Sequence, residues 1–256
     1  MLVRSRLSLS IAVCLSSLAG ATPALAQASD EQSVRQLEAL SVTATRGATK
    51  TETPVMETPQ TVNVISREEW QKRGAKSVQR AASYTPGAST SQVGSSNRYD
   101  YLVLRGFSSG SINNTYLDGL KVMNDGGSFS SFAIDPWLLE RIEIVKGPTS
   151  VLYGQSSPGG IVALTSKKPE FEFGGEIRAT LGSNAQRALA FDVTGPMDDD
   201  RRVAYRLAGK ISAADTQQDH VEEERRVIAP SLTWDITDYT SLTLLAYLQR
   251  DPEGGY

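Results

Sequence analysis

The chemically reactive side chains of this sequence are few and isolated. His220 is the only histidine and Cys14 the only cysteine among the 256 residues. One histidine allows at most one Ser-His-Asp arrangement, and one cysteine allows neither a disulfide framework nor a thiolate metal site. His220 lies in a charged stretch, residues 219–226, which we interpret as a solvated turn or rim. Nucleophilic catalysis and a protein-ligated metal are therefore not expected.

One glycine-rich loop, Gly154–Gly160, superficially resembles a phosphate-binding loop. A P-loop ends with a lysine and a hydroxyl side chain, and Gly160 and Ile161 stand at those two positions here. No paired carboxylates, histidine cluster or nucleophile elbow occurs elsewhere in the sequence. We therefore predict that the protein is not an enzyme.

The N-terminus has the composition of an export signal. Arg4 and Arg6 precede a short apolar run, residues 7–18, and Ala24–Ala26 fits a cleavage site. We expect residues 1–26 to be a signal peptide, with a buried helix as the alternative. Removal of the signal leaves 24 basic and 29 acidic residues, a net charge of −5, which argues against a nucleic-acid partner.

Residues 27–49 belong to a stretch rich in Thr, Ala, Glu and Pro without apolar periodicity, which predicts a mobile segment. Five residues within it alternate β-branched and small side chains, so they could add as a strand to the sheet edge of another protein. They are Leu40, Ser41, Val42, Thr43 and Ala44. An incidental extended linker is the alternative that this pattern leaves open.

Residues 50–168 show the pattern of a compact α+β domain. A strand over residues 61–65 is followed by Ser66 and Glu69, which have the spacing of a helix capping box. A second helix is expected over residues 77–83, ahead of a Pro-Gly breaker pair. Further strands are expected over residues 101–104, 114–117, 141–145 and 161–165.

Residues 169–256 change to a period-2 alternation of apolar and polar side chains. Turn residues separate the segments at 182–184, 195–200 and 235–238. This pattern predicts an antiparallel meander of about five strands with one apolar face, as a transmembrane barrel requires, with a soluble sandwich as the alternative. Because a plugged transporter barrel needs about 22 strands, the sequence is expected to be a fragment. The predicted fold class is an α+β domain followed by an incomplete antiparallel transmembrane β-barrel.

Five motifs within residues 83–160 resemble those of the plug domains of TonB-dependent receptors and occur in the family's order. They are SYTPG from Ser83, LRGF from Leu104, YLDGL from Tyr116, LERIEIVKGP from Leu139 and LYGQSSPGG from Leu152. Each motif alone is weak, whereas the ordered set is specific. The SSPGG form and the stretch INNTYLDGLK are most similar to the siderophore branch, in particular to receptors of the ferrichrome and ferrioxamine (hydroxamate) type.

The resemblance implies TonB-dependent import of a ferric siderophore across the outer membrane of a Gram-negative bacterium. Leu40–Ala44 would be the TonB box, and residues 50–168 would be the plug. Iron would travel inside its chelate, so no cofactor is implied. The expected partners are TonB with its inner-membrane energising complex, the ferric siderophore and outer-membrane lipid. The short segment before the box leaves no room for a signalling domain, which predicts transport without transcriptional signalling.

The resemblance also implies roles for two basic residues. Arg105 and Lys146 occupy positions where the family keeps basic side chains that pair with glutamates of the barrel wall and seat the plug. The alternative is that both are surface charges, each contributing under about 1 kcal/mol.

Ligand contacts are expected in the outward loops of the predicted plug. Gly110 matches a ligand-contacting glycine of ferrichrome-type receptors, and Ser111 follows it. A ligand-binding arginine of those receptors is replaced by a valine here, and an aromatic contact falls near a glycine. We expect the nearby Arg98 and Phe129 to substitute for them.

Two other functions fit part of the sequence. One is a TonB-dependent receptor for another ligand such as cobalamin or a sugar. The other is a secreted β-sheet adhesin, which needs neither plug motifs nor a TonB box. Deletion of Leu40–Ala44 separates the adhesin from a receptor, because only uptake depends on the box.

Overall fold

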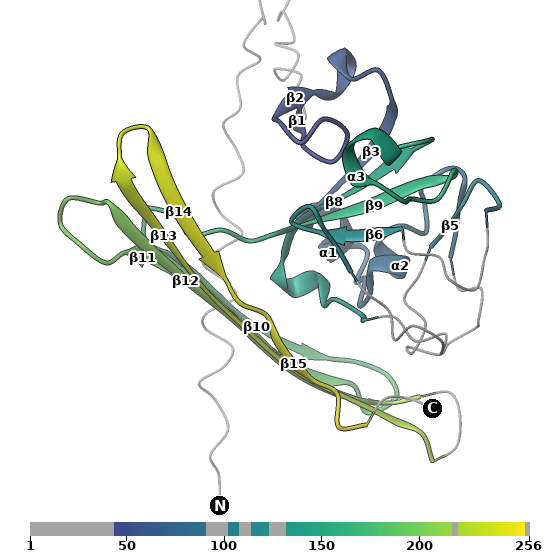
Figure 1. Ribbon diagram of the computed structural model, residues 1–256. Coiled ribbons are helices and arrows are strands. Elements are labelled where there is room, and N and C mark those ends of the chain that lie inside the picture. The colour runs from purple at the N-terminus through teal and green to yellow at the C-terminus, as the bar shows by residue number, and fades with distance from the viewer. Residues whose placement is uncertain (1–43, 91–101, 108–113, 123–131, 217–219, 254–256) are drawn as a thin grey trace, which may run out of the picture. The chain divides into compact units, whose positions relative to one another are not determined.

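The computed structural model describes residues 44–90, 102–107, 114–122, 132–216 and 220–253 (Figure 1). The chain divides into two compact units, residues 1–41 and 42–256, and all described residues belong to the second. The predicted signal peptide and Leu40–Thr43 of the predicted box lie outside the described residues.

A five-stranded sheet, called the mixed sheet below, organises the described residues before position 167. The strand order is β3-β8-β9-β6-β7, in which the β6–β9 pair is parallel and the other pairs are antiparallel. The strands are β3 (Thr61–Ser66), β6 (Thr115–Leu117), β7 (Leu120–Lys121), β8 (Leu139–Lys146) and β9 (Gly160–Ser166). The expected strands at 61–65, 114–117, 141–145 and 161–165 all fall in this sheet.

Two short helices, α1 (Arg67–Lys72) and α2 (Val78–Ala81), pack on one face of the mixed sheet. Ser66 caps α1 by accepting a hydrogen bond from the Glu69 N–H at 3.4 Å. The capping box is only half formed, because the Glu69 carboxylate pairs with Arg73 one turn later. The core of this face includes Trp70 of α1, Val78 of α2, and Ile142, Ile144, Val162 and Leu164 of the two central strands.

The other face of the mixed sheet is covered by the chain that precedes β3 and by the short helix α3. Ala48 and Tyr153 pack there against Val145 of β8. Thr45, Gly47 and Ala48, in the described end of the segment that the sequence predicts to be mobile, are therefore buried on this face. The elements of this layer are β1 (Ala44–Thr45), β2 (Thr53–Pro54), η1 (Val55–Glu57) and α3 (Ser150–Tyr153).

Three short elements complete the mixed-sheet domain. The predicted helix over residues 77–83 begins at Val78, capped by Ser77, and ends at Ala81. The chain after this helix turns at Gly87, whose φ of 74° favours glycine, and continues into a pair of short antiparallel strands. The elements are β4 (Ala88–Ser89), which pairs with β5 (Val103–Leu104), and the turn η2 (Pro136–Leu138), which leads into β8.

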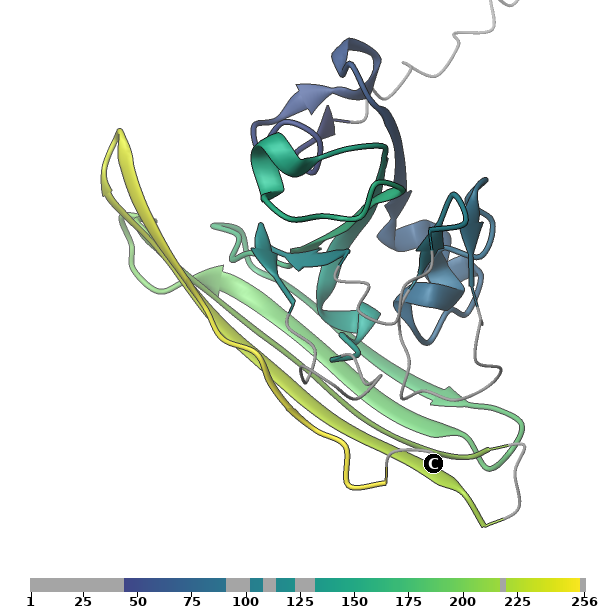
Figure 2. The same cartoon turned by 45° about the vertical axis from the view of Figure 1, so that its right-hand side comes forward.

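The second sheet, called the long sheet below, is an antiparallel meander of consecutive strands (Figure 2). The order is β10-β11-β12-β13-β14, and β15 also pairs with β13. The fifth predicted strand is thus interrupted at Ala246–Tyr247, which separates β14 from β15. The strands are β10 (Gly174–Leu181), β11 (Arg187–Pro196), β12 (Val203–Asp215), β13 (Glu222–Thr237), β14 (Thr240–Leu245) and β15 (Leu248–Arg250).

Two predicted turns are shorter than expected. Gly195 and Pro196 remain in β11, paired with β12, so that turn begins at Met197. Likewise β13 continues to Thr237 rather than ending at Asp235. Cross-strand pairing outweighs the local turn preference of glycine, proline and aspartate at these positions.

The long sheet has two unlike faces, and period-2 alternation separates them. Ile177 and Leu181 are 80% and 86% exposed on one face, whereas Ala190, Ala204 and Ala208 are buried on the other. The turn before β13 leaves His220 exposed, as expected for a rim, but Arg225 a few residues later is buried. Within the described residues, no helix is long and apolar enough to cross a membrane.

Candidate functional site

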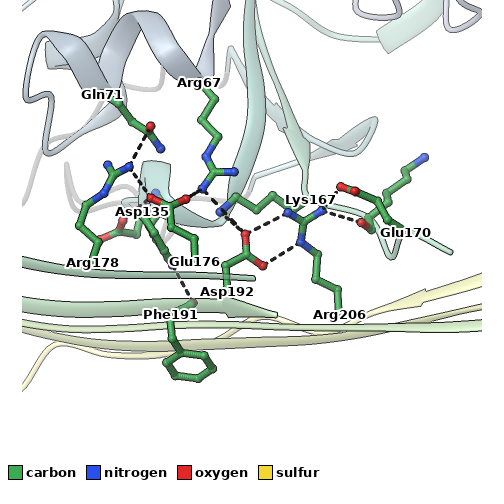
Figure 3. Close-up of polar contacts among 12 residues, drawn as sticks. Arg67, Gln71, Asp135, Lys167, Glu170, Glu176, Arg178, Phe191, Asp192 and Arg206 are labelled. Atoms are coloured by element: carbon green, nitrogen blue, oxygen red, sulfur yellow. Dashed lines mark hydrogen bonds and ion pairs between the residues drawn. The ribbon is translucent and has the colours of Figure 1, made fainter. Parts of the chain in front are cut away.

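A buried group of charges joins the long sheet to the mixed-sheet domain (Figure 3). Asp192 of β11 accepts hydrogen bonds from Lys167 Nζ at 2.7 Å and from Arg206 Nε and Nη2 at 2.8 and 2.9 Å. The side chains are 2%, 5% and 7% exposed for Lys167, Asp192 and Arg206. These three residues are called the Asp192 cluster below.

The strand register explains why the cluster forms. Asp192 lies opposite Ala208 on β12, so Arg206 is its diagonal neighbour on the same face. The small side chain of Ala208 leaves room for the guanidinium group to fold toward Asp192. Figure 3 shows Phe191, the residue before Asp192, on the opposite face of the sheet.

Lys167 comes from the end of β9, on the connection between the two sheets, so the cluster ties this connection to β11 and β12. Arg206 adds to this tie, because its Nη1 donates to Lys168 O at 2.8 Å and to Glu170 Oε1 at 2.9 Å.

Helix α1 is tied to the same region. Arg67 pairs with Glu176 of β10 and lies 3.9 Å from Asp192 Oδ2. One turn later, Gln71 Oε1 accepts a hydrogen bond from Arg178 Nη2 at 3.0 Å. The interface therefore links α1, the connection after β9 and the first three strands of the long sheet mainly through charged groups.

Trp137 of η2 forms the apolar centre of this interface. Its Nε1 donates to the Phe191 carbonyl oxygen at 3.0 Å. Three cations lie over the indole ring at 4.4, 5.1 and 5.4 Å, from Lys167, Arg178 and Arg67. The negative face of an aromatic ring attracts such cations, which offsets part of their mutual repulsion.

The pKa of Lys167 is lowered to about 8, mainly by burial and in smaller part by the positive charges of Arg67 and Arg206, while Asp192 opposes the shift. The site therefore disfavours the ammonium form of Lys167 relative to its form in water. Since removing one partner of a buried pair leaves an uncompensated charge, Asp192 is the residue on which the cluster depends.

A second polar contact lies around Asp135, next to Trp137. Its carboxylate pairs with Lys210 of β12 at 2.8 Å, and its backbone N–H donates to the Tyr247 hydroxyl at 2.9 Å. Tyr247 reaches this position from the interruption between β14 and β15. An irregularity that re-aims a side chain is typical of such strand breaks.

A cavity of about 360 Å³ lies between the β6–β7 hairpin and the long sheet. Leu117, Leu120 and Val122 line it on the hairpin side. The sheet side is lined by small residues, such as Ala208 and Ala229, and by larger ones that include Leu245 and Tyr247. The contact between the two sheets is therefore incomplete beside the polar cluster.

The structure brings the two predicted seating residues together. Burial lowers the pKa of Lys146, and the neighbouring Arg105 lowers it further. Arg105 is exposed and has a φ of 52°, a left-handed conformation that costs energy for a residue other than glycine. Among the described residues, no carboxylate pairs with either cation.

The predicted ligand contacts Arg98, Gly110, Ser111 and Phe129 lie outside the described residues. Of the predicted TonB box, only Ala44 is described, at the start of β1. In the described part of the chain, no group of three His, Cys, Asp or Glu side chains is arranged to hold a metal ion.

Sequence reasoning did not single out the Asp192 cluster. The alternating pattern places Asp192 and Arg206 on the polar faces of their strands. This pattern does not show which residue a polar side chain will contact. Lys167 stands next to Lys168, and nothing in the local sequence pattern distinguishes the two lysines. An acidic and a basic residue on inward positions of neighbouring predicted strands are the one signal that could have indicated the pair.

Comparison with known proteins identifies the class. Residues 54–161 match the model of the TonB-dependent receptor plug domain. The chain belongs to the TonB-dependent receptors. The predicted fold class is confirmed: the mixed-sheet domain is the plug, and the long sheet corresponds to strands of the barrel.

Individual relatives narrow the comparison to siderophore receptors. The ferrioxamine B receptor of Salmonella typhimurium (strain SL1344) is 61% identical over 209 residues, which cover 82% of this chain and 30% of that receptor. The ferrioxamine receptor of Yersinia enterocolitica is 44% identical over 249 residues, which cover 97% of this chain and 35% of that receptor. The chain thus spans about a third of the length of these relatives.

A solved receptor structure is also similar to this chain. The ferripyoverdine receptor of the outer membrane of Pseudomonas aeruginosa, bound to ferripyoverdine, matches with a TM-score of 0.71 and 28% identity. The match covers 82% of this chain and 27% of that one. All three relatives are receptors by name, in agreement with the prediction that the chain is not an enzyme.

Proposed function

We propose that this chain is part of an outer-membrane receptor that imports a ferric siderophore of the hydroxamate class, with a ferrioxamine as the first candidate. The observation that carries the proposal is the 61% identity to a ferrioxamine B receptor across most of this chain. Iron is the cargo inside its chelate, and no resident cofactor is proposed. TonB supplies the energy through the box at Leu40–Ala44.

The interface between plug and barrel supports a role in gated transport. Its contacts combine the ion pairs and hydrogen bonds of the Asp192 cluster and Asp135 with a small apolar group around Trp137. Polar interfaces within one chain are typical of parts that move relative to one another. Charged groups that separate are rehydrated, which offsets part of the free-energy cost of moving the plug away from the wall.

The cavity beside the β6–β7 hairpin supports the same role. Its sheet side combines small side chains, such as Ala208 and Ala229, with larger ones that include Leu245 and Tyr247, so the free volume next to the hairpin lies over the alanines. Movement of a packed element needs such free volume, because protein interiors are otherwise close-packed.

We assign roles to two groups of residues from the positions that they share with members of the receptor family. Arg105 and Lys146 seat the plug on carboxylates of the barrel wall, which explains two adjacent cations without a described counter-ion. Arg98, Gly110, Ser111 and Phe129 contact the ferric siderophore from the outward loops.

The experiment is uptake of radiolabelled iron by receptor-deficient cells that express the full-length receptor. Ferrioxamine, ferrichrome and a catecholate chelate are compared, with and without Leu40–Ala44. Deletion of the equally long Asp30–Val34, upstream of the box, is the matched control. Box-dependent uptake of ferrioxamine, unaffected by the control deletion, is the expected result.

Other outcomes would redirect the assignment. Uptake of none of the three chelates, with the receptor present in the outer membrane, would refute the siderophore proposal and favour cobalamin or a sugar. Cell adhesion that is indifferent to the box deletion, without any uptake, would favour an adhesin.

A further inference from the structure

Glu143 is a buried carboxylate at the centre of the mixed sheet that takes no part in the contacts to the long sheet. Its side chain is 1% exposed. The carboxylate accepts hydrogen bonds from Thr45 Oγ1 at 2.9 Å, from the Arg46 backbone N–H at 3.2 Å and from the Gly47 backbone N–H. Arg141, two residues earlier on β8, adds an ion pair at 3.0 Å.

The three hydrogen-bond donors are consecutive residues that precede Glu143 by 96 to 98 positions. They begin a segment, residues 45–50, that lies on the face of the mixed sheet opposite α1 and α2. Gly47 is required by the close approach, because an added Cβ would collide with Glu143 Oε2 and lie 3.0 Å from the Ala163 Cβ. The backbone is thus fitted to the carboxylate.

The remaining contacts of segment 45–50 are few. The β1–β2 ladder joins only two residue pairs. Ala48 contributes a single methyl group to the core on this face. Lys50 places its Nζ 4.6 Å from the centre of the Tyr153 ring. Glu143 therefore supplies the largest set of hydrogen bonds between this segment and the sheet among the described residues.

We propose that Glu143 is a latch that holds segment 45–50 on the plug, and that breaking its hydrogen bonds limits the release of this segment. Segment 45–50 follows Leu40–Ala44 without a gap, so any force applied at those residues reaches the latch first. This last point rests on the proposed function, because it takes Leu40–Ala44 as the attachment point of TonB.

A carboxylate suits a bond that must break and re-form. In the docked state the charge is compensated by three donors and the Arg141 guanidinium group. In the released state the covering segment is gone, so water replaces the donors and the charge is not left buried without partners. The Glu143 charge is therefore compensated in both the docked and the released state of segment 45–50. The segment can be pulled away without unfolding the apolar core between the mixed sheet and helices α1 and α2.

The latch is tested by cysteine labelling of the full-length receptor in outer-membrane vesicles from cells without TonB. Ala48 is 5% exposed and does not contact Glu143 by any hydrogen bond, so Ala48→Cys reacts with a maleimide only when the segment is released. Ala82→Cys, at a fully buried position behind α2, reports general unfolding of the plug. Each is combined with Glu143→Gln and with the matched control Glu140→Gln, an exposed carboxylate on the same strand.

Glu143→Gln keeps the shape of the side chain but loses the charge and one acceptor oxygen. We expect it to accelerate labelling at Ala48→Cys about 10- to 100-fold, with Ala82→Cys unchanged and Glu140→Gln without effect at either position. Unchanged labelling at Ala48→Cys would overturn the latch. Equal acceleration at both cysteines would also overturn it, because Glu143 would then be an ordinary determinant of plug stability.

The labelling uses neither TonB nor a siderophore, so it is independent of the proposed function. Failure of chelate uptake with the expected labelling would refute the transport assignment and leave the latch. Normal box-dependent uptake with unchanged labelling would refute the latch and leave the transport assignment.

Discussion

Replacement of Asp192 by asparagine should detach the plug from the barrel wall. The substitution keeps the side-chain volume but removes the negative charge between Lys167 and Arg206, whose donors lie 2.7 to 2.9 Å from it. All three side chains are at most 7% exposed, so water cannot compensate. Removing one partner of such a buried pair costs about 3–5 kcal/mol, or roughly 100- to 5,000-fold in the equilibrium between attached and detached plug.

Labelling of a cysteine at position 190 measures this equilibrium in outer-membrane vesicles. Ala190 lies on β11, is 4% exposed and packs in the same cluster as Trp137, so Ala190→Cys reacts only when the plug separates from the sheet. The control is Asp199→Asn, an exposed carboxylate in the turn after β11. We expect Asp192→Asn to accelerate labelling at least about 100-fold and Asp199→Asn to leave it unchanged.

The reasoning is refuted if Asp192→Asn labels within threefold of the control. A second variant tests the charge argument itself. Adding Lys167→Met to Asp192→Asn removes the ammonium group that lost its partner, so part of the attachment should return. No recovery would mean that the unpaired ammonium group of Lys167 is not the cause of the detachment.

Lys167, Gly47 and the Arg105–Lys146 pair give three further predictions. The pKa of Lys167 is lowered from 10.5 to about 8, so between these values the unfolded chain binds a proton that the folded plug lacks. The free energy of unfolding of the plug in guanidinium, followed by tryptophan fluorescence, should therefore rise with pH over this window by up to about 3 kcal/mol relative to Lys167→Met. A fall of this free energy over the same window would contradict the prediction. Gly47→Ala should overpack the latch by about 1–3 kcal/mol and release segment 45–50 in the latch assay, and unchanged labelling would show that the close approach is tolerated. Arg105→Gln with Lys146→Gln should accelerate labelling at position 190 at least about tenfold if the pair seats the plug on barrel carboxylates, and no acceleration would make the seating role wrong.

The local structure of the plug could be predicted because its signals are contained in short stretches of sequence. Ser66 precedes α1 by one residue and caps it, and the strands around it are apolar runs bounded by turn residues. The capping box predicted at this place is only half formed. Glu69 has the spacing of a capping box, but Arg73 one turn later competes for its carboxylate, and the ion pair forms.

The meander of the long sheet was also predictable, because period-2 alternation fixes which side chains share a face. The ends of the strands were not. Gly195, Pro196 and Asp235 favour turns locally, yet the neighbouring strand continues to pair with them. The interruption that sends Tyr247 toward Asp135 has no local signal either, since its cause is a partner 112 residues earlier in the chain.

The sequence by itself determined the family, the order of the elements and the faces of the strands, because these depend on motifs and on neighbours a few residues apart. The tertiary structure alone decided which buried charges meet. Asp192 was a polar residue on an alternating strand and Glu143 a carboxylate in an apolar run until the fold supplied Lys167 from 25 residues away and Thr45 from 98 residues away. A buried charge is stable only with partners in place, and the sequence pattern records that a polar residue is present without recording what it faces.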